Sequence, residues 1–101
     1  MVIVIASVET NAETLASLRE ALLTMQEASR AEPGCHDYTF SQELGDPNRL
    51  RVVEIWDSMD ALREHFGMPH MATFRAALAA TPPQSMDLRV HELGERLELP
   101  S

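Results

Sequence analysis

The sequence predicts a single α+β domain over residues 1–101, with a ferredoxin-like β-α-β-β-α-β order around an antiparallel sheet. Apolar and polar residues alternate in three stretches, which is the period of a strand, and a fourth stretch, Val2–Val8, is a short apolar run typical of a strand covered on both faces. Between these stretches apolar residues recur every three or four positions, which is the period of an amphipathic helix. The resulting order is strand, helix, strand, strand, two helices, strand, so the helices are expected to cover one face of the sheet.

The first strand and the first helix have the clearest signals. Val2–Val8 is apolar on both alternating faces, which predicts a central place in the sheet. Thr10 and Glu13 have capping-box spacing, so a helix is expected to begin there. One helix of about five turns should run from this cap to a point before Pro33, which disfavours helical geometry in the preceding residue. Its apolar stripe is Leu15, Leu18, Leu22 and Met25.

The other elements follow from the same periods and from Gly and Pro at their ends. Strands are expected over Cys35–Gln42 and Leu50–Trp56, joined by a turn at 45–48, and a last strand over Met86–Leu93. A helix capped by Asp57 or Ser58 should end at Gly67, with the buried stripe Met59, Leu62 and Phe66. A further helix with the stripe Met71, Phe74 and Leu78 should end at Thr81.

Polar residues in the two central strands are candidates for a site. Alternation places His36 and Tyr38 on one face of their strand, and Glu54 and Trp56 on one face of the next. A buried carboxylate without a partner is costly, so Glu54 is expected to be hydrogen-bonded or to meet water. His70, at the start of a helix, would supply such a partner.

Composition excludes several classes of function. Sixteen acidic residues against eight basic ones argue against binding to nucleic acid or to an anionic membrane. All eight basic residues are Arg, so Schiff-base and P-loop lysine chemistry are excluded. Cys35 is the single cysteine, and the apolar N-terminus is too short to span a bilayer. We therefore expect a cytoplasmic protein.

The second face of the sheet predicts a homodimer. Ile3, Ile5, Val53 and Ile55 would be exposed there, and a second copy of the sheet would cover them. Alternation returns in the tail at Leu97 and Leu99, which indicates that the tail contacts something, and we expect this to be the partner.

Four segments carry a resemblance to a known family. They are E-P-G-C-H-x-Y, G-D-P-N-R, V-E-I-W-D-S-M-D-A-L and P-H-M-A-T-F. In this order and spacing they resemble the antibiotic-biosynthesis-monooxygenase family of the dimeric α/β-barrel superfamily. The resemblance implies a homodimer with sheets packed face to face, and a pocket between sheet and helices in each subunit. Members of the superfamily include cofactor-free oxygenases of phenols and quinols, haem-degrading enzymes, an isomerase of a signalling sugar phosphate and proteins without known activity.

Particular branches fit less well. Polyketide oxygenases of the family bind substrate through an Asn, a Tyr and an Arg, and the matching positions here are Val52, Leu62 and Arg75. Two of these three are apolar, which argues against that polyketide chemistry. The haem-degrading branch is similar through Trp56 and His65, but its first-strand Asn has no counterpart.

The sharpest hypothesis puts Glu54, Trp56 and His70 around one cavity, where Glu54 orients His70 as the catalytic base. A cofactor-independent monooxygenase needs such a base, donors for the substrate anion and apolar walls, so that a phenol or quinol anion reduces dioxygen directly. Predicted substrate-binding residues are Trp56, Arg75, His36, Tyr38, His65, Phe66 and Phe74.

Other interpretations remain open for the same residues. The first is a non-catalytic protein that binds a small aromatic molecule in the same pocket. Trp56 and Tyr38 can be core residues, and His70 can simply cap its helix. No cofactor is expected, because there is no dinucleotide fingerprint, and no metal is expected, although His65 and His70 with Glu54 are the combination nearest to a ligand set.

Overall fold

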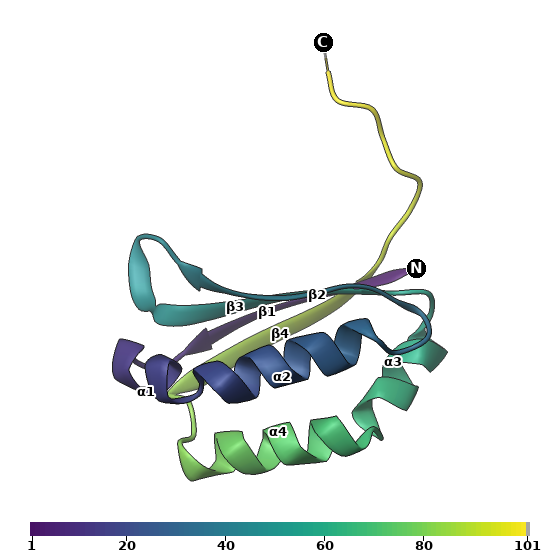
Figure 1. The fold of residues 1–101 in the computed structure, drawn as a ribbon. Helices are drawn as coiled ribbons and strands as arrows, with labels where there is room; N and C mark the ends of the chain where they lie inside the picture. The colour runs from purple at the N-terminus through teal and green to yellow at the C-terminus, as the bar shows by residue number, and fades with distance from the viewer. Residues whose placement is uncertain (101) are drawn as a thin grey trace.

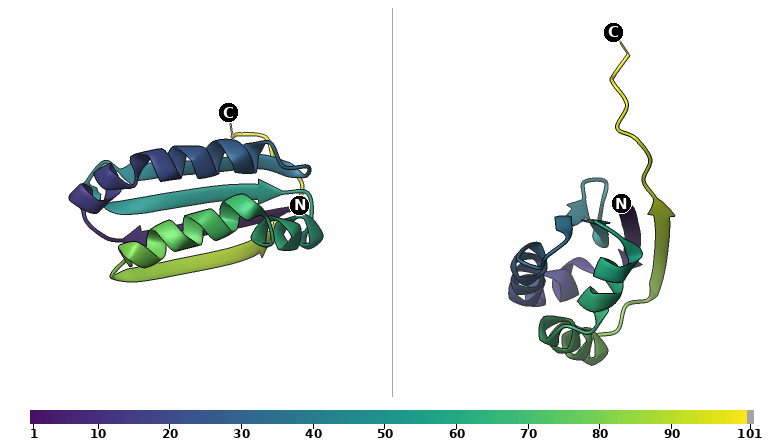
Figure 2. Two further views of the ribbon diagram at one scale, coloured as in Figure 1. Left: turned by 60° about the horizontal axis from the view of Figure 1, so that its bottom comes forward. Right: turned by 90° about the vertical axis from the view of Figure 1, so that its right-hand side faces the viewer.

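The computed structural model describes residues 1–100, which form a four-stranded antiparallel sheet with four helices on one face (Figures 1 and 2). The strand order is β2-β3-β1-β4, and the predicted ferredoxin-like fold is confirmed. The elements are β1 (Val2–Glu9), α1 (Ala12–Ser17), α2 (Arg19–Arg30), β2 (Cys35–Glu43), β3 (Asp46–Trp56), α3 (Met59–Phe66), α4 (Pro69–Ala80) and β4 (Ser85–Glu92).

Strand β1 is central, as predicted, and pairs with β3 on one side and β4 on the other. Its even-numbered residues face the helices and are buried, from Val4 at 1% exposure to Val8 at 9%. Ile3 and Ile5 face the opposite side of the sheet and are partly exposed. The core therefore lies between the sheet and the helices.

The first helical segment differs from the prediction in two ways. It is two helices, because the backbone at Leu18 turns to ψ 0° and separates α1 from α2. Its N-cap is Asn11 and not Thr10, since the Asn11 side chain accepts a hydrogen bond from the Thr14 N–H at 2.8 Å. Asn48 in the hairpin accepts from the Ala12 N–H at 2.9 Å, which ties the start of α1 to β3.

The β2–β3 hairpin also has a tighter turn and an irregular first strand. Strand β3 begins at Asp46, so residues 46–48, predicted as a turn, are part of the strand. The pairing register shifts between Cys35 and Asp37, which makes His36 the extra residue of a β-bulge. The bulge moves His36 off the face of Tyr38 and exposes it, where it pairs with Asp57. The prediction that His36 and Tyr38 share one face is wrong.

Helices α3 and α4 position the remaining candidate residues. Ser58 caps α3 by accepting from the Ala61 N–H at 3.2 Å, which confirms one of the two predicted caps. Leu62 is buried as predicted, but Met59 and Phe66 of the expected stripe are 40% and 41% exposed. Pro69 is the first residue of α4, where its missing N–H has no consequence.

The sheet face opposite the helices carries a row of partly exposed apolar side chains. After Glu92 the chain leaves the body on this side and extends away from it (Figure 1). Leu97 and Leu99 in this tail are 83% and 92% exposed. Within residues 1–100, no helix is long and apolar enough to cross a membrane. The row consists of Ile3, Ile5, Val53 and Ile55.

Candidate active site

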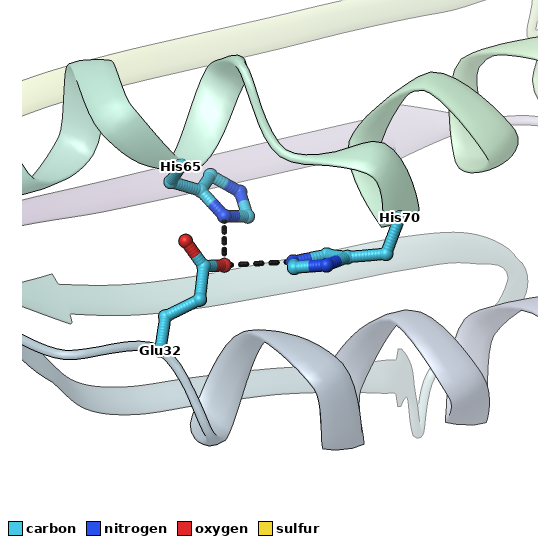
Figure 3. A group of neighbouring side chains, drawn as sticks. All are labelled: Glu32, His65 and His70. Atoms are coloured by element: carbon cyan, nitrogen blue, oxygen red, sulfur yellow. Dashed lines mark hydrogen bonds and ion pairs between the residues drawn. The ribbon is translucent and has the colours of Figure 1, made fainter.

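A carboxylate and two histidines converge where three segments meet. Glu32 lies in the loop between α2 and β2, His65 lies near the end of α3, and His70 lies in the first turn of α4. The Glu32 Oε2 atom is 2.6 Å from His65 Nδ1 and 2.8 Å from His70 Nε2 (Figure 3). Each ring donates an N–H to the same oxygen, so Glu32 fixes the orientation of both histidines.

This cluster corrects the predicted partner of His70. The hypothesis paired His70 with Glu54, but its hydrogen-bond partner is Glu32. The sequence pointed to Glu32 only as the residue before Pro33 in the E-P-G segment. Its side-chain direction depends on the turn that follows α2, which periodicity does not describe.

Glu54 lies on the helix-covered face of β3 beside Trp56. The Trp56 indole N–H donates to Glu54 Oε1 at 2.9 Å, and both residues are buried, at 0% and 7% exposure. Burial raises the pKa of Glu54 to about 7, with a smaller contribution from the charge of Glu32, while the Trp56 hydrogen bond acts in the opposite direction. Glu54 is therefore able to gain and lose a proton near neutral pH.

Aromatic rings connect the two carboxylates. The His65 ring centroid is 4.6 Å from that of Trp56 and 5.5 Å from that of Tyr38. Burial lowers the pKa of His65, against the opposing effect of Glu32, and so favours the neutral imidazole. Burial, with the nearby charge of Glu54, raises the pKa of Tyr38, so its hydroxyl stays protonated as a hydrogen-bond donor.

A cavity of about 210 Å³ lies between the sheet and α4 and has Glu54 in its wall. Among the described residues that line it, only Tyr38, Glu54 and Arg75 are polar or charged. The Arg75 guanidinium donates to the Phe66 carbonyl at 2.8 Å, which holds it at the cavity. The apolar lining is Ala6, Val8, Phe40, Leu50, Val52, Phe66, Met71, Phe74, Leu78, Met86 and Leu88.

A second hollow of about 330 Å³ lies between the first two helices and the hairpin. Among its described lining residues Arg19 is the only charged one, and none is a carboxylate or a histidine. The larger hollow therefore lacks an acid or a base, and the smaller cavity at Glu54 is the better candidate for chemistry.

Comparison with known proteins agrees with this architecture. The sequence profile of a family described as "Antibiotic biosynthesis monooxygenase" matches residues 1–77. Rv0793 from Mycobacterium tuberculosis, whose name proposes a monooxygenase, is 37% identical over 75 residues, which cover 74% of this chain and 73% of that protein.

The chain belongs to the antibiotic biosynthesis monooxygenase family. An uncharacterised protein of Synechocystis is 28% identical over 72 residues, and the match spans 71% of this chain but only about half, 49%, of that relative. A crystal structure from Deinococcus radiodurans, described as a proposed antibiotic biosynthesis monooxygenase, covers 100% of both chains with a TM-score of 0.90 at 29% identity. Family and fold are therefore the same as those inferred from the sequence segments.

Within this family fold, the predicted site residues fall into four places. Tyr38, Glu54, Phe66, Phe74 and Arg75 line the cavity together. Their roles in binding or catalysis stay predictions.

The other predicted residues lie outside the cavity lining. Trp56, expected as a cavity wall, is fully buried behind it and supports Glu54. His65 and His70 belong to the Glu32 cluster, and His36 lies on the exposed bulge. The arrangement thus divides into a cavity with a titratable carboxylate and a hydrogen-bonded cluster connected to it through Trp56 and His65.

Proposed function

We propose that the protein is a cytoplasmic, cofactor-independent monooxygenase that oxidises a small phenolic or quinol-type substrate with dioxygen. Family membership supports a monooxygenase at the level of the family. The observation that carries the finer proposal is Glu54, a buried carboxylate with a pKa of about 7 in the wall of an otherwise apolar cavity. A pKa close to the operating pH is what a general base requires.

Glu54 takes the role of the base, in place of His70. Glu54 is in the cavity wall, whereas the Nε2–H of His70 is occupied by Glu32. The ionised carboxylate removes the proton of a substrate hydroxyl, and the Trp56 N–H holds the carboxylate in place. Burial favours this transfer, because it makes the protonated form of Glu54 more stable than it would be in water.

The phenolate is then the only electron donor that the reaction needs. It transfers one electron to dioxygen, and the superoxide and phenoxyl radicals combine at a ring carbon to give a peroxide anion. This anion takes the proton back from Glu54 and becomes a hydroperoxide. Loss of water leaves a quinone, so one oxygen atom enters the product and the other leaves in water. For a phenol the balance is substrate plus O₂ to quinone plus H₂O.

The other polar residues of the cavity suit stabilisation of the anion. Tyr38 donates its hydroxyl, which the raised pKa keeps protonated, and Arg75 supplies a positive charge. Phe66 and Phe74 provide aromatic walls that exclude water. A volume of about 210 Å³ is below the ~300–1,000 Å³ of typical ligand sites, which favours a small substrate.

Oxygen consumption with a panel of one- and two-ring phenols and quinols tests the proposal. Turnover is expected to rise with pH through about 7, because Glu54 must be ionised. Glu54→Gln keeps the acceptor for Trp56 but not the base, and should lower kcat by about 10²–10⁴. The matched control Glu27→Gln, on the exposed face of α2, should leave kcat unchanged. Equal activity of Glu54→Gln and wild type would exclude Glu54 as the base.

The second candidate function is binding of a small molecule without catalysis. The same small cavity, with its three polar residues, is also suited to binding alone. Binding of a phenol without oxygen consumption at any pH between 5 and 9 would favour it. Turnover that requires added flavin or haem would instead favour another branch of the superfamily.

We also propose that the protein is a homodimer. The apolar row on the open face of the sheet and the exposed Leu97 and Leu99 support it, because a second copy would cover both. Light scattering is expected to give the mass of two chains, and removal of residues 94–101 should weaken the association. A one-chain mass at micromolar concentration would contradict the proposal.

A further inference from the structure

We propose that Glu32, His65 and His70 form a binding site for one divalent transition-metal ion of the Zn²⁺ class. The inference goes beyond the proposed monooxygenase function, whose steps occur at Glu54 in the cavity and use no metal. The three side chains come from the α2–β2 loop, α3 and α4. One ligand atom from each lies within 4.8 Å of the other two.

The chemistry of these three atoms suits such an ion. Two imidazole nitrogens and one carboxylate oxygen are a set that zinc enzymes use when a fourth position is left for water or substrate. Glu32 and His65 are buried, with side chains 5% and 1% exposed, whereas the His70 side chain is 21% exposed. An ion and its fourth ligand would therefore enter beside His70. The positive charge of the ion would balance the negative charge of the buried Glu32 carboxylate.

Only a small movement separates the hydrogen-bonded cluster from a metal site. Ligand atoms around a tetrahedral Zn²⁺ with bonds of 2.0–2.1 Å lie ~3.3 Å apart. The Glu32 oxygen is now 2.6 Å and 2.8 Å from the two nitrogens, so these separations must increase by about 0.7 Å and 0.5 Å. Glu32 is in a loop and His70 is in the first turn of a helix, so neither movement breaks the sheet.

Proton balance does not oppose binding. In a neutral imidazole the N–H can be on either ring nitrogen, so an N–H on Nε2 of His65 and on Nδ1 of His70 leaves the other nitrogen of each ring with a lone pair for the ion. No redox step is involved.

A neighbouring charge provides a sharp test of the site. Arg75, on α4, is close enough for its positive charge to act on His65. The same charge must oppose a cation held by Glu32, His65 and His70. Arg75→Gln is therefore expected to tighten metal binding.

The experiment is a titration of the full-length, chelator-treated protein with Zn²⁺ by calorimetry, with Co²⁺ absorption as a spectroscopic probe. We expect one Zn²⁺ per chain and visible Co²⁺ bands of a low-coordinate site. His70→Ala and Glu32→Gln should weaken Zn²⁺ binding at least about tenfold. Arg75→Gln should strengthen it.

His36→Ala is the matched control, because His36 also pairs with a carboxylate, Asp57, but on the exposed surface. It should leave Zn²⁺ affinity unchanged. His70 is partly exposed, so its variant should fold where His65→Ala could fail, and circular dichroism checks this.

Absence of saturable Zn²⁺ binding by the wild type would overturn the proposal. So would a loss of affinity in His36→Ala as large as that in His70→Ala. Oxygen consumption is not a readout here, so the metal site and the monooxygenase proposal can fail separately.

Discussion

Glu32 and Glu54 are buried to nearly the same degree, 9% and 7% exposed, but they differ in the donors that reach them. Two histidine N–H groups meet one oxygen of Glu32, whereas Glu54 receives a single indole N–H. His65 donates to Glu32 and Trp56 donates to Glu54, and the centroids of these two rings are 4.6 Å apart. Two carboxylates with similar burial thus occupy different hydrogen-bonding environments within one site.

The difference indicates that one carboxylate of the core holds segments together, whereas the other is able to exchange a proton. Glu32 is held by donors from two helices, and it joins the α2–β2 loop to α3 and α4. Glu54 has too few donors to offset its desolvation, so its pKa is raised to about 7. The under-satisfied carboxylate is also the one that faces the cavity.

The largest effect on stability is expected from removal of Glu32, the carboxylate that accepts two hydrogen bonds. Glu32→Ala leaves two N–H donors without an acceptor, one of them on the fully buried His65, and should lower the free energy of unfolding by about 3–5 kcal/mol. Urea unfolding measures it. Glu27→Ala on exposed α2 is the control and should change little. A loss below about 1 kcal/mol would show that Glu32 does not join these segments.

Removal of the Glu54 carboxylate should raise the free energy of unfolding at high pH, whereas removal of Glu32 lowers it. The folded pKa of Glu54, about 7, lies above its ordinary value of 4.5, so the folded state binds the proton more tightly. Stability from this group is therefore complete below pH 4.5 and is lost as pH rises through 7. At 1.36 kcal/mol per pKa unit, the loss above pH 7 is on the order of 3 kcal/mol.

Glu54→Gln does not ionise and should escape this loss. Urea unfolding should show it more stable than wild type at pH 8 by on the order of 3 kcal/mol, and nearly equal to wild type at pH 4. An identical difference at both pH values would mean that Glu54 does not titrate with a raised pKa.

Much of the fold was readable from the sequence because its signals are local. The apolar residues on both faces of Val2–Val8 predicted the central strand, and Ser58 was one of two predicted caps. The break at Leu18 was missed because the apolar stripe keeps helical spacing across it. A single residue with ψ near 0° interrupts a helix without changing which residues are buried.

The site was readable only in part, because it depends on contacts between distant segments. The shared face of Glu54 and Trp56 follows from alternation, and their hydrogen bond agrees with it. The bulge at His36 shifts the alternation by one residue, and Pro33 and Gly34 mark the start of the strand but not the bulge inside it. Glu32 meets residues 33 and 38 positions away, so its partners depend on how α3 and α4 pack.

A smaller effect is expected when the single donor of Glu54 is removed. Trp56→Phe deletes the indole N–H, which now lowers the pKa of Glu54, and should move that pKa above about 7. The pH dependence of turnover should shift upward with it. The lost hydrogen bond and the smaller ring should also cost about 2 kcal/mol of stability. An unchanged pH profile of turnover would show that the Trp56 hydrogen bond does not affect the pKa of Glu54.

The smallest effect is expected at Asp57, which, like Glu32, pairs with a histidine. Its partner His36 is on the β-bulge, and the two side chains are 59% and 45% exposed. Water and salt weaken an exposed pair, whereas Glu32 and His65 are shielded from both. His36→Ala should therefore change the free energy of unfolding by less than about 1 kcal/mol, and the change should shrink further in 1 M salt. A loss in His36→Ala as large as that in Glu32→Ala would mean that burial does not set the strength of these pairs, and the contrast between the carboxylates would have to rest on the number of donors alone.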